Sequence, residues 1–132
     1  MPAAQNVASV VALFERVLNA GDISALEEFA HRDVVVPESA PGIESFRRLL
    51  VGMRTTFANP EYKVIETVSE GEKVVARFSA KATHAGRYMG IPATGRRLNL
   101  WGVMIFRFEA GAIAEFWSLV DSQGILRQLR EP

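Results

Sequence analysis

Two side chains in the C-terminal half of the chain have types and positions suited to moving a proton. Asp121 follows an apolar stretch that contains Trp117, Leu119 and Val120. In such a setting a carboxylate is poorly solvated, which raises its pKa toward the range useful for removing a proton beside a carbonyl. Alternatively, Asp121 begins a terminal helix and accepts its first backbone N–H bonds, which lowers the pKa of a carboxylate. The local sequence favours this helix cap.

His84 is the second candidate, at the end of a stretch in which Ala76, Phe78, Ala80 and Ala82 alternate with polar residues. At the mouth of a pocket it could donate a proton or a hydrogen bond to a substrate carbonyl. A single histidine at a strand end is more often structural, and the residues alone favour that interpretation. The small alanines either admit a closely packed helix, which we favour slightly, or leave a cavity.

Other chemistries find no support in the residues. The chain has no cysteine, which excludes thiolate catalysis and cysteine-based metal sites. His31 and His84 are its only histidines, and neither has a carboxylate at ligand spacing, so no metal site is expected. The segment GIPATGRR lacks the lysine of a phosphate-binding loop, and no serine lies in a nucleophile elbow.

Length and charge limit the possible partners. A chain of 132 residues fits one domain, and we expect a single domain over residues 1–132. Fifteen basic and fifteen acidic residues give no net charge, which disfavours binding to nucleic acid or to an anionic membrane. The N-terminus meets Glu15 and Arg16 before an apolar run reaches signal-peptide length, so a cytoplasmic location is expected.

Periodicity predicts three helices before the sheet. Apolar residues at three- and four-residue steps indicate a first helix over 7–18. Ser24 and Glu27 have the spacing of a capping box and predict a short second helix, followed by a brief strand over 34–36. A third helix is expected over 43–57, ended by Asn59 and Pro60.

From Tyr62 onward the apolar period is two, which predicts four strands. They cover residues 62–68, 74–84, 97–108 and 113–120, with a loop over 85–95 and a terminal helix over 123–129. Strands joined by short turns pair antiparallel, and the helices pack as a group on one face. The predicted fold is therefore α+β, with N-terminal helices on a curved antiparallel sheet that forms a half-open cone.

The strand over 97–108 is apolar on both of its alternating faces. One set is Leu98, Leu100, Met104 and Phe106, and the other is Trp101, Val103 and Ile105. If helices cover only one face, the other is expected to be buried against the same sheet of a second copy, which predicts a homodimer. The alternative is a strand wrapped entirely within the monomer.

The C-terminal half resembles the SnoaL-like polyketide cyclase family, which typically shows T-H-x-G, G-x-P-x-T-G-R, x-G-x-I-x-E-x-W and a final D before x-x-L-x-Q-L. The matching residues are Thr83, His84, Gly86, Gly90, Pro92, Thr94, Gly95, Arg96, Gly111, Ile113, Glu115, Trp117, Asp121, Leu126, Gln128 and Leu129. The N-terminal half agrees more loosely. The resemblance implies an NTF2-like cone-shaped barrel.

Members of that family close a polyketide ring by intramolecular aldol condensation, using an aspartate and no metal or organic cofactor. Asp121 matches that aspartate by position, which reverses the local preference for a cap. The resemblance thus implies a cofactor-independent enzyme in which Asp121 removes a proton from an apolar, cyclic or polyketide-like substrate. His84 or a pocket water would stabilise the enolate oxygen. The expected pocket walls are Trp101, Trp117, Phe46, Met53 and Met104.

Two alternatives stay open. A ketosteroid-isomerase-like or epoxide-hydrolase-like enzyme would need a second acidic or phenolic group in the pocket. A non-catalytic protein that binds small apolar ligands would use Asp121 only as a helix cap. Replacing Asp121 with Asn separates these classes, because the amide preserves the shape of the side chain and removes the base.

Overall fold

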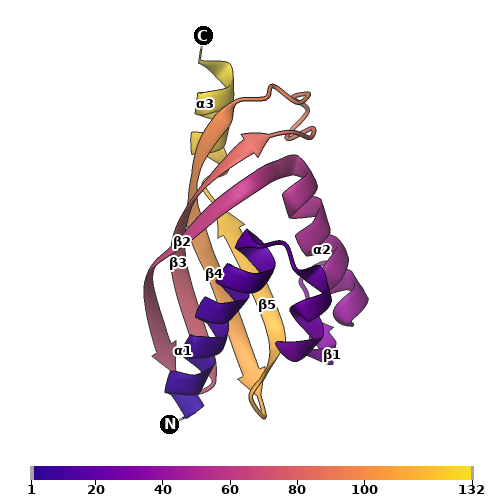
Figure 1. Cartoon of the computed structure of the whole chain (residues 1–132), viewed down its shortest axis with the longest axis vertical. Helices are drawn as coiled ribbons and strands as arrows, with labels where there is room; N and C mark the ends of the chain where they lie inside the picture. Colours follow the sequence, from indigo (N-terminus) through magenta and orange to yellow (C-terminus); the bar gives the residue numbers. More distant parts are fainter. Residues whose placement is uncertain (1, 132) are drawn as a thin grey trace.

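Helices cover one face of a single curved sheet in the computed structural model, which describes residues 2–131 (Figure 1). The N-terminal elements are α1 (Pro2–Leu13), a π-helical continuation η1 (Phe14–Asn19), a 3₁₀ helix η2 (Ile23–Glu28), β1 (Ala30–Val35) and α2 (Ile43–Thr56). Four strands and a last helix follow: β2 (Phe57–Glu70), β3 (Lys73–His84), β4 (Arg97–Glu109), β5 (Ala112–Val120) and α3 (Ser122–Arg130). The predicted α+β fold is confirmed.

The sheet has five strands in the order β1-β5-β4-β3-β2. Strands β2 to β5 form the predicted antiparallel meander, while β1 pairs parallel with β5 at one edge. The sheet stays open because β1 and β2 do not pair with each other. The brief strand expected over 34–36 is therefore longer than predicted and contributes an edge of the sheet.

The core lies between the sheet and the helices. α1 contacts β2 and β3, and α2 contacts β1 and β2. The expected core-facing set of β3, Ala76 to Ala82 in steps of two, is buried, as alternation along a strand requires. Phe46 of α2 packs on Phe116 of β5 with 4.8 Å between the ring centroids, so aromatic rings fill much of the interior.

Two predicted helix boundaries are wrong. The capping box is absent, because η2 is a 3₁₀ helix and Ser24 Oγ donates a hydrogen bond to Asp22 Oδ1 (2.6 Å) instead. α2 ends at Thr56, and Asn59 and Pro60 lie within β2, where the pairing with β3 shifts between Ala58 and Glu61. Proline lacks an N–H, and a bulge tolerates that loss without stopping the strand.

The loop between β3 and β4 lies at the end of the molecule that also carries α3, next to the C-terminal end of α2 (Figure 1). Ala85 N and Gly86 N both donate to Thr56 O, at 2.9 and 3.2 Å. A side chain at Gly86 would meet Thr56 Cα at 3.1 Å, so a larger residue there would require the backbone of Thr56 to shift. None of the helices in residues 2–131 has the length and apolar character needed to cross a membrane.

Candidate active site

His84 is fully buried at the end of β3, and its ring nitrogens have different surroundings. Thr94 N donates to Nδ1 at 3.1 Å, and Thr94 Oγ1 lies 2.9 Å from the same nitrogen. Because Nδ1 accepts a backbone N–H, the neutral ring carries its proton on Nε2. Within residues 2–131, Nε2 is the only buried side-chain nitrogen or oxygen without a hydrogen-bond partner. An unpaired buried donor costs about 1–3 kcal/mol.

An apolar hollow of about 410 Å³ lies between α2 and the β3–β4 loop. Phe57, in its lining, is the direct cross-strand partner of His84 and packs against Tyr88 with ring centroids 5.1 Å apart. Met53, one of the predicted wall residues, lies in the same lining. His84 itself is not part of the lining, and Phe57 connects the hollow to it through the pairing of β2 with β3.

Phe57 and Tyr88 were not predicted as site residues. Phe57 had been assigned to the end of a helix, although β3 recruits it as the first residue of β2. Tyr88 lies in a loop without periodicity, and its hydroxyl is 3.0 Å from Ser122 Oγ of α3. The side chain of Tyr88 therefore lines the hollow. The only sequence signal near Tyr88 was the Thr-His pair of the family motif.

Phe46 and Met104, two of the predicted walls, lie inside the molecule. Both are fully buried, on α2 and β4 respectively. They lie in the packed core rather than in the lining of the open hollow.

Asp121 has a different environment from the one that the family resemblance suggested. It is the N-cap of α3, where Gly124 N donates to its Oδ1 at 3.1 Å. Trp101 Nε1 donates to the other carboxylate oxygen at 3.0 Å. Because Trp101 alternates with buried Leu100 and Gly102, this bond places the carboxylate on the outward side of the sheet. The expectation of a dry apolar pocket around Asp121 is wrong, and the cap favoured by the local sequence is what forms.

The prediction that the two tryptophans form pocket walls is also wrong. Trp101 is 55% exposed and Trp117 is 46% exposed, and both project from the outward face of the sheet. They had been assigned to pocket walls for their chemistry, whereas strand alternation decides the face on which a side chain lies. Neither lines the interior.

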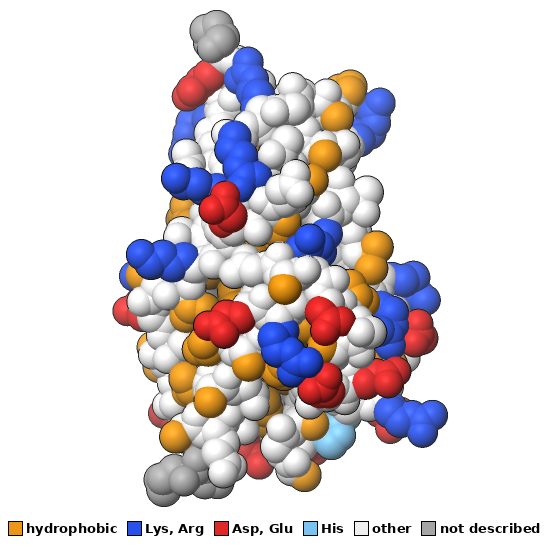
Figure 2. Space-filling model, viewed as in Figure 1, with side chains coloured by type: hydrophobic (Ala, Val, Ile, Leu, Met, Phe, Trp, Pro, Cys, Tyr) orange, Lys and Arg blue, Asp and Glu red, His pale blue; other side chains and the backbone are white. Residues whose placement is uncertain are grey.

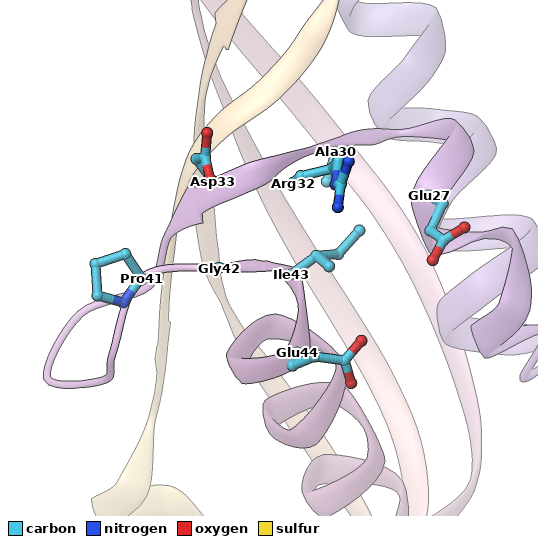
Figure 3. A pocket seen from close by; sticks show the side chains of 8 residues that line it. All are labelled: Glu27, Ala30, Arg32, Asp33, Pro41, Gly42, Ile43 and Glu44. Atoms are coloured by element: carbon cyan, nitrogen blue, oxygen red, sulfur yellow. The ribbon is translucent and has the colours of Figure 1, made fainter.

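A larger cleft, of about 1040 Å³, lies where β1 meets the start of α2 (Figure 3). Arg32 points into it from β1, and Glu27 and Glu44 approach from η2 and α2. Arg47 lies 3.3 Å from Glu27 Oε1 and 3.4 Å from Glu44 Oε1. The cleft is open and charged and contains none of the predicted site residues, so it does not suit a mainly apolar substrate.

Fold and motifs together define a family. The model of the SnoaL-like polyketide cyclase family matches residues 8–129, and the chain belongs to that family. It is 29% identical over 120 residues to a nogalonic acid methyl ester cyclase of Streptomyces nogalater, covering 86% of this chain and 90% of the relative. It is 30% identical over 121 residues to an aklanonic acid methyl ester cyclase of Streptomyces peucetius, covering 86% and 83%.

Solved structures show the same architecture. TsrD from Streptomyces laurentii superposes with a TM-score of 0.81 at 34% identity, over 93% of this chain and 96% of that one. A SnoaL-like polyketide cyclase from Agrobacterium tumefaciens superposes with a TM-score of 0.82 at 25% identity, over 92% and 94%. The fold is thus the NTF2-like arrangement of helices on a curved, open sheet.

Proposed function

We propose that this chain is a polyketide-cyclase-type enzyme that acts without a cofactor on an apolar, polyketide-like or cyclic carbonyl compound. The observation that carries the proposal is the unpaired Nε2–H of His84, whose cross-strand partner Phe57 lines an apolar hollow. A substrate carbonyl oxygen would supply the missing acceptor. Membership of the cyclase family supports the choice of substrate class.

The proposed reaction is an intramolecular aldol condensation. Breaking a C–H bond beside the carbonyl leaves an electron pair that moves onto the carbonyl oxygen. The enolate carbon then forms a C–C bond with a second carbonyl of the same molecule, whose oxygen takes up a proton. The hydrogen bond from Nε2–H to the first oxygen strengthens as negative charge grows on that oxygen. Loss of one such donor typically lowers kcat about 10²–10³-fold.

Asp121 is the proton acceptor in the proposed reaction. Asp121 matches the family aspartate, but its two carboxylate oxygens accept hydrogen bonds from Trp101 and Gly124 on the outward side of the sheet. To act as the base, the carboxylate must break both bonds and turn inward. Each bond to a charged group contributes about 1.5–3 kcal/mol, so this movement is costly.

Substrate access requires movement of the β3–β4 loop, because His84 has no exposed surface. The hydrogen bond between the Tyr88 hydroxyl and Ser122 Oγ ties this loop to α3, and two backbone bonds tie it to Thr56. In the proposed cycle the loop opens to admit the ligand and closes over it, excluding water from the enolate.

Turnover of nogalonic and aklanonic acid methyl esters, the compounds in the names of the relatives, tests the proposal. H84L removes the donor and is expected to lower kcat about 10²–10³-fold. H84Q restores an N–H donor and should retain more activity. H31Q changes the exposed histidine, which bonds only to Glu109 O, and serves as the matched control. Wild-type turnover by a folded H84L protein would overturn the proposal.

A non-catalytic binder of small apolar ligands is the second candidate, favoured by the capping role of Asp121. D121N distinguishes it from an enzyme that uses this carboxylate. If Asp121 is the base, D121N abolishes turnover and retains ligand binding; if the protein only binds, function does not change. The phenol of Tyr88 in the hollow is the second group that an isomerase-like or epoxide-hydrolase-like reaction would need, and Y88F tests that role.

A further inference from the structure

An exposed threonine is in contact with the fully buried histidine. Thr94 is an exposed residue of the loop between β3 and β4, whereas His84 has no exposed area. On the face that Figure 2 shows, the end of the molecule that carries α3 displays Lys and Arg side chains and no pale blue histidine surface. The hydroxyl oxygen of Thr94 nevertheless lies 2.9 Å from Nδ1 of the buried ring. Thr94 therefore connects the surface of the protein to the candidate donor.

The loop residues 94–96, which we call the histidine clamp, hold His84 by its backbone as well as by its ring. Gly95 N donates to His84 O at 2.9 Å, and His84 N donates to Arg96 O at 2.8 Å. Gly95 has a φ of 73°, a left-handed conformation that glycine adopts without strain. The turn at Gly95 thereby brings Thr94 to the side of the ring that carries Nδ1.

The hydrogen-bond partners of the Thr94 hydroxyl determine where its proton points. Arg96 N donates to Thr94 Oγ1 at 3.2 Å, so the oxygen is an acceptor on that side. Its own hydrogen is then available to His84 Nδ1, 2.9 Å away. Thr94 N donates to the same ring nitrogen at 3.1 Å. Nδ1 thus receives two donors from one residue.

The histidine clamp is itself attached to α3. Arg96 Nη1 donates to Gln128 O at 2.7 Å, in the last turn of the helix. The carbonyl end of a helix favours a cation. The Gln128 side chain also bonds to both backbone groups of Asn99 in β4, at 2.8 and 2.7 Å. The β4 end of the loop is therefore fastened separately from the end that contains Tyr88.

We propose that Thr94 is a positioning residue for His84, and that its two donors hold His84 as a fixed hydrogen-bond donor rather than as a proton-transfer group. The amide determines the tautomer, with the proton on Nε2, and the hydroxyl fixes the direction in which that proton points. The consequence for turnover rests on the proposed function of His84, whereas the arrangement at Nδ1 does not.

The two donors decide between the roles that the sequence left open for His84, which were to give a proton or to give a hydrogen bond. A histidine that hands over its Nε2 proton must take another at Nδ1 to stay neutral. A proton at Nδ1 would face the N–H of Thr94 across 3.1 Å, so two hydrogens would meet in one contact. His84 therefore keeps its proton, and the new hydroxyl of the product receives its proton from the protonated Asp121 or from water.

The free protein tests the arrangement at Nδ1 without any substrate. T94V replaces the hydroxyl by a methyl group at an exposed position, so the fold is expected to persist. In long-range ¹H–¹⁵N correlation spectra the His84 ring should stay protonated at Nε2, because the amide is retained, while Nδ1 moves downfield as it loses one donor. T94S keeps the hydroxyl and should retain the wild-type Nδ1 resonance.

The matched control for this spectrum is T55V, which removes an exposed hydroxyl that donates to Val51 O within α2. It should leave both ring resonances of His84 unchanged. An Nδ1 resonance that does not move in T94V overturns the proposal.

Turnover tests whether the arrangement at Nδ1 matters for the reaction. T94V is expected to lower kcat about five- to tenfold, the effect of losing one ordinary hydrogen bond, with KM nearly unchanged. T94S should be close to wild type, and T55V should be unchanged. In the H84L protein T94V should cause no further loss, because Thr94 acts through the ring. Wild-type kcat in T94V, or a full T94V effect in H84L, overturns the positioning role.

These results separate the positioning role from the proposed function. Wild-type turnover by folded H84L overturns the proposed function, while the Nδ1 resonance still reports on Thr94. A low kcat in H84L together with wild-type kcat in T94V retains the proposed function and overturns the positioning role. In the complex with aklanonic acid methyl ester, the His84 ring should stay protonated at Nε2 alone. A proton on Nδ1 in that complex contradicts the fixed-donor role.

Discussion

One backbone N–H determines what His84 can do. The amide of Thr94 donates to Nδ1, which leaves the proton on Nε2 facing no acceptor. Strand alternation alone predicted that His84 belongs to the core-facing set, and its burial confirms this. The tautomer of His84 could not be predicted from the sequence, because it depends on Thr94, a loop residue ten positions further along the chain whose amide contacts the ring.

Tyr62 provides a prediction at the same scale. Burial among Phe14 and Phe78 raises the pKa of its phenol from 10.0 to about 12. Because the pKa of Tyr62 is higher in the folded than in the unfolded protein, burial of the neutral phenol stabilises the folded state. This contribution is complete below the unfolded pKa of 10.0 and is lost as the pH rises toward 12.

Absorbance at 295 nm should therefore show one of the two tyrosines ionising near pH 12. Y62F should remove that transition and part of the alkaline loss of unfolding free energy. Complete ionisation of both tyrosines near pH 10 in the folded protein would contradict the burial of Tyr62.

The strands were the most predictable elements. The predicted ranges for β3 and β4, 74–84 and 97–108, differ from Lys73–His84 and Arg97–Glu109 only at their ends, since a period of two persists along both strands. The junction of α2 and β2 was not predictable in this way. Phe57 continues the helical rhythm of α2, but pairing with His84 makes it a strand residue, so tertiary contacts override the local pattern.

Two glycines in these elements should respond oppositely to alanine. A side chain at Gly102 of β4 would collide with the backbone oxygen of Leu119 in β5, so G102A is expected to cost about 1–3 kcal/mol of unfolding free energy. Gly52 in α2 has nothing within 4 Å of an added Cβ, so G52A should stabilise by up to about 1 kcal/mol. Urea denaturation measures both changes, and equal effects in the two variants would contradict this packing of β4 against β5.

At the scale of the whole molecule, the sequence predicted the fold and the family correctly but not the outward position of Asp121 and the two tryptophans. A family motif predicts which position holds the aspartate, but it does not predict where the carboxylate points. The orientation of the Asp121 carboxylate depends on its hydrogen bond from Trp101. The same rule of alternation that buried His84 turned both tryptophans outward.

The proton positions on the His84 ring, measured in the whole folded protein by long-range ¹H–¹⁵N correlation spectroscopy, test the account most directly. The account predicts a neutral ring protonated at Nε2 in the free protein. On addition of aklanonic acid methyl ester, the Nε2 proton should move downfield as it gains a carbonyl acceptor. A ring protonated at Nδ1, or an Nε2 signal that does not change when the ester binds, would contradict the proposed role of His84.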